Sequence, residues 1–180
     1  MISRAFGRLL GRRIRRWRAG DQWRVGADIR FSQVPRTVAL GSPAFDDGAP
    51  LPRSTTSPPL TWSGVPSQTK RIVLIVEDVD VPMLRPLTHA IAYAIDPAAT
   101  ELAEGALDGA HEAMGFNGAG RRGWLPPSPP PGHGPHRYVF TLLAVDFVPR
   151  FDQPPTRGRL LDAIAGHVAA LAEIVGTAER

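Results

Sequence analysis

The stretch Arg71–Asp96, RIVLIVEDVDVPMLRPLTHAIAYAID, predicts the centre of the fold, because two apolar runs flank a loop with two aspartates and a proline. Residues 72–76 are a continuous run of β-branched residues and leucine, which is typical of a strand buried on both faces. Asp78, Asp80 and Pro82 follow as D-x-D-x-P. Pro82 stiffens this loop because its ring fixes φ and pushes the preceding residue into an extended conformation.

Alternation of side chains predicts a second strand over residues 87–95. A strand points successive side chains to opposite faces. We therefore expect Leu87, His89, Ile91, Tyr93 and Ile95 on one face, with the intervening alanines on the other.

The later stretch His136–Asp146, HRYVFTLLAVD, has the composition of a third strand. His136, Tyr138 and Phe140 are expected on one of its faces. Two carboxylates, two histidines and a tyrosine thus lie at strand ends beside proline-rich loops, and the functional interpretation depends on whether these groups converge.

These motifs resemble the phosphatidylethanolamine-binding protein family, and most closely its bacterial branch, often called Raf-kinase-inhibitor-like. The resemblance rests on D-x-D-x-P, the following strand with its histidine, and G-x-H-R-Y, taken in that order. It extends from about Ala39 to Arg180 and includes three further stretches: Ser57–Trp62 (SPPLTW), Gly115–Gly118 (GFNG) and the proline-rich segment Pro126–Pro131.

The resemblance implies a β-sandwich with a small pocket at one end that takes anions such as a phosphate head group. Matched motif by motif, the implied ligand-binding residues are Asp78, Asp80, Pro82, His89, Pro129, Pro130, His136 and Tyr138. The family usually has glycine where this chain has Pro126. Proline has no backbone N–H, so the resemblance implies one anion contact fewer here.

The chemistry of these residue types is coherent. Carboxylates favour protonated imidazole, so we expect Asp78 and Asp80 to raise the pKa values of His89 and His136 above the usual value of about 6.5. Each imidazolium then donates to the anion, and the Tyr138 hydroxyl adds a donor. The remaining histidines are expected to be structural: His111, His133 and His167.

Other functions remain open at this stage. Asp78, Asp80, His89 and His136 are also a possible ligand set for a metal ion, which would make the protein a metal-dependent hydrolase. No H-E-x-x-H or G-x-S-x-G occurs. We therefore expect a binding protein without catalytic residues, cofactor or metal. A kinase or another signalling protein is an expected partner class, and a homodimer is open.

The segment pattern predicts a mostly β protein: an antiparallel β-sandwich with a C-terminal helix and few short peripheral helices. Residues 105–135 are rich in glycine and proline and are expected to form a functional loop. Further expected elements are strands at Trp23–Ile29 and Val38–Phe45, a short helix at Ala98–Glu104, and a helix over Gly158–Val175 that ends at Gly176.

Charge divides the chain unevenly. Residues 1–36 contain ten arginines and two aspartates, a net charge of +8, and the remainder has eleven basic and fifteen acidic residues, a net of −4. We expect residues 1–24 to be a basic amphipathic arm and residues 25–180 to be a single domain. Apolar residues recur at helical spacing through residue 18.

The arm has two readings: a solvated extension, or a helix that binds an anionic membrane surface or a partner. Nucleic acid is not an expected partner, because no reading module is recognisable. If the arm is separable, deleting residues 1–20 should cost little stability.

Composition narrows the class of protein further. The chain has no cysteine, which excludes disulfides, zinc thiolates and a thiol nucleophile. No stretch approaches the ~20 apolar residues that span a bilayer, and we expect no secretory signal, because arginines interrupt the N-terminal apolar residues. The expected location is the cytoplasm, with peripheral membrane association as an option.

Overall fold

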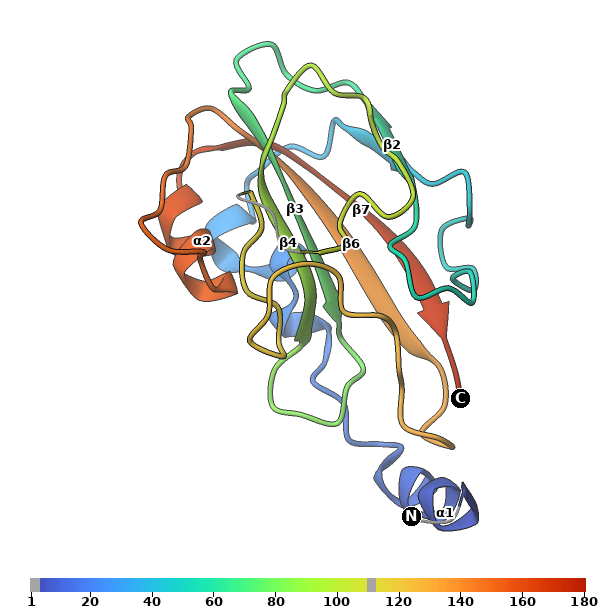
Figure 1. The fold of residues 1–180 in the computed structure, drawn as a ribbon. Coiled ribbons are helices and arrows are strands. Elements are labelled where there is room, and N and C mark those ends of the chain that lie inside the picture. The colour runs from blue at the N-terminus through green and yellow to red at the C-terminus, as the bar shows by residue number, and fades with distance from the viewer. Residues whose placement is uncertain (1–3, 110–112) are drawn as a thin grey trace.

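The computed structural model describes residues 4–109 and 113–180, and it places two antiparallel sheets and a small helical layer on top of one another (Figure 1). The smaller sheet has the order β1-β2-β5 and the larger β4-β3-β6-β7. The strands are β1 (Ala39–Gly41), β2 (Leu60–Ser63), β3 (Arg71–Asp78), β4 (Leu87–Ile95), β5 (Glu101–Leu102), β6 (His136–Val145) and β7 (Val168–Ala178).

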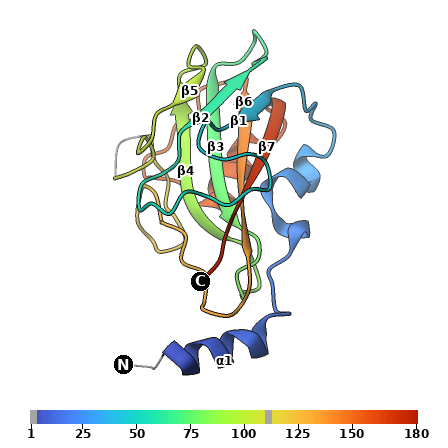
Figure 2. The same ribbon diagram turned by 90° about the vertical axis from the view of Figure 1, so that its right-hand side faces the viewer.

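Helical structure is limited. Helix α1 (Arg4–Ile14) lies below the sheets in Figures 1 and 2, and α2 (Arg157–Ile164) covers one face of the larger sheet. Three 3-10 turns follow α1: η1 (Asp21–Trp23), η2 (Val25–Ala27) and η3 (Ile29–Phe31). Among the described residues, no helix is long and apolar enough to cross a bilayer. The predicted mostly β sandwich is confirmed.

The larger sheet buries both of its faces. One apolar cluster fills the space between the two sheets and includes Leu60, Trp62 and Phe140. A second cluster lies on the opposite face, where Leu160 and Ile164 of α2 pack on the sheet. This double burial explains why β3 reads as an uninterrupted apolar run rather than an alternating one.

The expected faces of β4 hold only in its middle, because two β-bulges interrupt the strand. Val76 pairs with Ala90, but Glu77 pairs with Thr88, so His89 is an extra residue without an opposite partner. The predicted grouping of His89 with Ile91 is therefore wrong: the bulge turns the His89 ring toward the inter-sheet side.

The predicted C-terminal helix is half wrong. Residues 157–164 are helical, but residues 168–178 form β7, which pairs along the full length of β6. Gly166 turns the chain at a φ of 80°, a conformation that glycine adopts without strain. The open edge of β6 would otherwise leave backbone groups unpaired, and this requirement outweighs the helical spacing. Gly176 is inside β7 and packs against Leu51.

Three other expected elements differ. The strand at Trp23–Ile29 is wrong, since this segment forms 3-10 turns. The strand within Val38–Phe45 is confined to three residues. The helix at Ala98–Glu104 is also wrong: β5 pairs with β2 there, and the short apolar pattern did not distinguish the two states.

A buried ion pair connects α2 to the centre of the larger sheet. Glu77 is fully buried, Arg157 Nε donates to its Oε1 at 2.5 Å, and the backbone N–H of Val25 donates to Oε2 at 2.8 Å. Burial raises the pKa of Glu77, and Arg157 opposes that rise. Both carboxylate oxygens therefore depend on partners supplied by other segments.

We predict that Arg157→Met lowers the free energy of unfolding by about 3–5 kcal/mol, because it leaves a buried carboxylate without its cation. Adding Glu77→Gln should restore part of the loss. Arg159→Met is the matched control, since Arg159 is exposed on the same helix. Urea denaturation of the four proteins measures this, and equal losses for the two arginine variants would contradict it.

Candidate functional site

Three strand ends meet at one end of the larger sheet and bring most of the predicted site residues together. Asp78 is the last residue of β3, and it pairs across the sheet with Tyr138 of β6. His136, the first residue of β6, places Nδ1 2.7 Å from Asp78 Oδ2. The ring of His89 lies edge-on to Tyr138, with 5.0 Å between the ring centroids.

His89 presents one nitrogen without a partner. Its Nδ1 lies 2.5 Å from the Leu125 carbonyl oxygen, which only accepts, so Nδ1 carries the proton in the neutral ring. Its Nε2 then carries a lone pair and can only accept a hydrogen bond. Among the described residues nothing hydrogen-bonds to this buried atom.

Two donors beside His89 are also unsatisfied. The Trp124 ring lies 6.2 Å from the His89 ring. Within the described part of the chain, neither Trp124 Nε1 nor the Tyr138 hydroxyl has a hydrogen-bond partner, although both atoms are buried. A buried polar atom without a partner costs about 1–3 kcal/mol, so three around one histidine indicate a site that a polar ligand completes.

The charge of His89 differs from the expectation. Burial lowers the pKa of His89 below its usual value, and the Leu125 carbonyl and Asp78 oppose this only in part. The predicted rise is wrong for this residue because burial outweighs the nearby carboxylate. Burial and Asp78 raise the pKa of Tyr138, and the nearby backbone of Ser128, too poorly placed to form a hydrogen bond with the hydroxyl, opposes the rise only in part, so the hydroxyl stays protonated.

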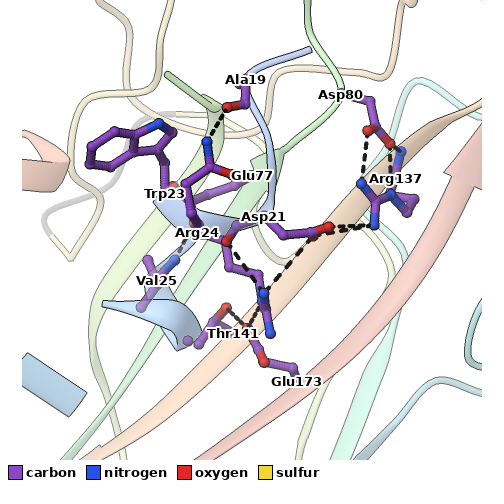
Figure 3. Close-up of polar contacts among 12 residues, drawn as sticks. Ala19, Asp21, Trp23, Arg24, Val25, Glu77, Asp80, Arg137, Thr141 and Glu173 are labelled. Atoms are coloured by element: carbon purple, nitrogen blue, oxygen red, sulfur yellow. Dashed lines mark hydrogen bonds and ion pairs between the residues drawn. The ribbon is translucent and has the colours of Figure 1, made fainter. Parts of the chain in front are cut away.

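Asp80 does not join the imidazoles. Arg137 donates to both of its oxygens from Nε and Nη2, at 2.8 and 2.9 Å, and Arg18 Nη1 lies 2.9 Å from Oδ1 (Figure 3 shows the Arg137 contacts). Burial acts to raise the pKa of Asp80, but these arginines outweigh it and hold the pKa at about 2. Direct contact between Asp80 and a ligand therefore stays a prediction.

The predicted prolines lie around the same end of the domain. Pro129 is buried and lines a groove of about 730 Å³ together with Pro127 and Pro135. The Pro130 carbonyl accepts from the backbone N–H of His133, and Pro82 is half-buried. Their ligand contacts also stay predictions.

Sequence reasoning missed His133. This residue is fully buried, and its Nδ1 lies 2.7 Å from His136 Nε2. Its own Nε2 lies 3.0 and 3.2 Å from the carbonyl oxygens of Ile14, the last residue of α1, and of Trp17, just beyond the helix. The available signal was H-x-x-H in GHGPHR. His167, in contrast, pairs with Asp146 at the surface, and His111 lies outside the described residues.

The hydrogen bonds that link Asp78, His136 and His133 in a row require one proton more than an ionised carboxylate and two neutral imidazoles carry. The two carbonyl oxygens only accept, so His133 Nε2 is protonated, and an ionised Asp78 likewise requires a proton on His136 Nδ1. If both rings are neutral, His133 Nδ1 and His136 Nε2 each carry only a lone pair, so no proton is left for the hydrogen bond between them. The count is the same if Asp78 is the protonated group. With all of these hydrogen bonds formed, the three side chains together hold one proton more than an ionised Asp78 with two neutral imidazoles. Their net charge is then zero.

Other groups near the chain do not supply this proton. His89 favours the neutral form, and Asp80 is held ionised by two arginines. The Arg15 guanidinium lies near Gly134, between His133 and His136 in the sequence, and is a permanent cation. Within residues 4–109 and 113–180, no three His, Asp or Glu side chains are arranged to hold a metal ion.

The fold and the site define a β-sandwich binding module with a cluster of buried histidines at one end. The family model described as phosphatidylethanolamine-binding protein matches residues 41–179. The chain belongs to the phosphatidylethanolamine-binding protein family.

Relatives are found in bacteria and archaea. A UPF0098 protein from Chlamydia trachomatis is 42% identical over 153 residues, which cover 79% of this chain and 99% of that protein. A UPF0098 protein from Methanothermobacter thermautotrophicus is 34% identical over 151 residues, with 78% and 98% covered. A Mycobacterium tuberculosis relative named as a lipoprotein, LppC, is 35% identical over 152 residues, with 81% and 73% covered.

Solved structures agree with the fold. The phosphatidylethanolamine-binding protein homologue CT736 from Chlamydia trachomatis has a TM-score of 0.73 at 39% identity, covering 81% of this chain and 99% of its own. YbcL from Escherichia coli, described as a new member of the mammalian family, has a TM-score of 0.71 at 26% identity, with 80% and 99% covered.

We predict that the hydrogen bonds of His133 to the Ile14 and Trp17 carbonyl oxygens help to hold the arm on the domain. The chain has no cysteine, so Arg13→Cys carries a single fluorophore whose anisotropy reports docking. His133→Phe should lower the anisotropy because it removes these bonds, and the surface variant His167→Gln should leave it unchanged. Equal anisotropy in the two variants would contradict this role of His133.

Two glycines of α1 provide a matched pair for the same assay. A Cβ on Gly11 would lie 2.2 Å from the Pro131 carbonyl oxygen, whereas a Cβ on Gly7 meets nothing within 4 Å. Both alanine substitutions favour the helix. We expect Gly11→Ala to lower the anisotropy and Gly7→Ala to preserve it. Equal effects would show that the helix does not dock as described.

Proposed function

We propose that the protein binds a phosphate-type anion, with the head group of a phospholipid as the favoured class. The observation that carries this proposal is the group of three buried, unsatisfied atoms: His89 Nε2, Trp124 Nε1 and the Tyr138 hydroxyl. Two of them donate hydrogen bonds, and the third donates once protonated. A phosphate presents several acceptor oxygens that match such a set.

Proton transfer accompanies the proposed binding. The neutral His89 offers a lone pair to the ligand, and an anion pressed against it would be repelled. If the ring takes up a proton at Nε2, it becomes a donor with a positive charge. A bound anion thus raises the pKa of His89 from its lowered value. Asp78 is already engaged by His136 at 2.7 Å, which limits its repulsion of the ligand.

An apolar cavity next to Trp124 favours an amphiphilic ligand over a free ion. The cavity is about 240 Å³ and is lined largely by proline and aliphatic side chains, among them Leu51, Pro58 and Pro59. A ligand with an anionic end at His89 and an apolar or glycerol portion in this cavity would use both features.

The binding function is favoured over the metal-dependent hydrolase. Both ring nitrogens of His136 are engaged, by Asp78 and by His133, and Asp80 is held by arginines. A kinase or signalling partner is not part of the proposal, because no observation on the described residues favours one. Turnover of p-nitrophenyl phosphate that is lost in His136→Ala would reverse this preference.

We expect the affinity for dimethyl phosphate, a permanent monoanion, to fall as pH rises. The unliganded His89 has a lowered pKa, so binding takes up a proton between that pKa and the higher one of the complex. Uptake of one proton changes the affinity by about tenfold per pH unit. Calorimetry from about pH 5 to 8 measures this, with glycerophosphoethanolamine as a second probe for a head-group preference.

Variants of the same assay locate the effect. His89→Gln should flatten the pH dependence, and the surface variant His167→Gln should not. Affinity independent of pH in the parent would contradict the role of His89.

Tyr138→Phe separates stability from binding. The hydroxyl has no partner among the described residues, so its removal should leave the free energy of unfolding equal or higher by up to about 1–3 kcal/mol. The affinity for dimethyl phosphate should nevertheless fall several-fold. Thermal denaturation and calorimetry measure the two effects. A destabilised variant with unchanged affinity would show that this hydroxyl is a structural group.

A further inference from the structure

Helix α1 docks on the domain through a glycine. Gly11 packs against the backbone of Pro131 and His133 so closely that a side chain has no room. Beyond the helix, Arg18 bonds to Asp80 and to the Pro135 carbonyl, and the backbone of Ala19 pairs with that of Val81. The arm therefore contacts the domain at several points, and both the boundary at residue 24 and the small cost of deleting residues 1–20 stay predictions.

The helix leaves apolar side chains uncovered. Leu9 is 61% exposed and Trp17 is 55% exposed. In an amphipathic helix of a globular protein the apolar side chains normally face the core. Here Leu9 in the helix and Trp17 just beyond its end stay largely exposed, while Gly11 makes the close approach to the domain.

Arginines surround these apolar groups. Residues 1–20 contain seven arginines and no carboxylate. Four of the arginines are exposed around Leu9 and Trp17: Arg12, Arg13, Arg15 and Arg16. An apolar stripe flanked by arginine is the pattern of helices that lie in the interface of an anionic bilayer.

The β3–β4 loop extends the same surface. Met83 and Leu84 at its tip are both exposed, and the loop and α1 lie at the same end of the molecule in Figures 1 and 2. Two elements far apart in the sequence thus present apolar side chains at the end of the domain where His133 and His136 lie.

We propose that this surface, formed by Leu9, Trp17, Met83, Leu84 and the four exposed arginines, docks the protein on an anionic lipid bilayer. Charge complementarity selects anionic lipid, and the exposed apolar side chains enter the boundary between head groups and acyl chains. Docking holds the histidine-lined end of the domain against the membrane. The inference does not depend on the pocket ligand, since none of these side chains belongs to the unsatisfied group around His89.

The test is sedimentation of the full chain with vesicles. Vesicles of phosphatidylcholine with about one third phosphatidylglycerol should bind the protein, and pure phosphatidylcholine should bind at least about tenfold more weakly. Raising the salt from about 0.1 to 0.5 M should weaken binding, because salt screens the arginines. Equal binding to both vesicle types would overturn the proposal.

Substitutions assign the surface. Trp17→Glu and Leu84→Glu should each reduce binding several-fold, whereas Ile29→Glu, at a residue 82% exposed outside the surface, should not. Brominated lipid should quench tryptophan fluorescence in the parent but not in Trp17→Phe. Stronger binding to RNA or to a protein partner than to vesicles, or identical effects of the Ile29 and Trp17 variants, would overturn the assignment. The affinity for dimethyl phosphate should be the same in all variants, so failure here leaves the pocket test intact.

Discussion

The register between β3 and β6 is the constraint on which the site depends. Because Asp78 pairs directly with Tyr138, the carboxylate that ends one strand comes to lie beside the histidine that begins the other. The same register sets Glu77 opposite Val139, so its side chain faces the second apolar cluster and reaches Arg157. One pattern of backbone hydrogen bonds thus distributes consecutive carboxylates to opposite faces, where they meet different partners.

Asp78 and Asp80 differ in their hydrogen-bond partners and therefore in their chemistry. Asp78 holds an imidazole and belongs to a proton-sharing chain, whereas Asp80 is fixed by guanidinium groups and has a pKa of about 2. Burial works against charge at Asp80 and at His89. The arrangement that results is a neutral imidazole between unsatisfied donors, flanked by carboxylates that are already neutralised. Under the proposed function, such a site would accept an anion together with a proton more readily than an anion alone.

The sequence was sufficient for the features that local pattern encodes. The double-sided burial of β3 and the alternation of β6 followed from runs of residues, and motif order placed carboxylates and histidines at neighbouring strand ends without showing that Asp78, rather than Asp80, meets His136. The strand nature of β7 did not follow, because it depends on the free edge of β6, which is far away in the chain. His133 was set aside because the carbonyl oxygens that engage it come from the arm, more than a hundred residues earlier. The neutrality of His89 required its burial to be known.

The bulge at His89 has a consequence for how such proteins diverge. A single extra residue in β4 decides whether this histidine faces the unsatisfied donors or the opposite layer of the sheet. Loss of one residue at this position would remove the bulge and turn the side chain beside Ala90 away from Trp124 and Tyr138. Two chains with the same fold and nearly the same residues can therefore differ in whether a histidine faces these donors. An alignment that places a gap a few residues away would hide that difference.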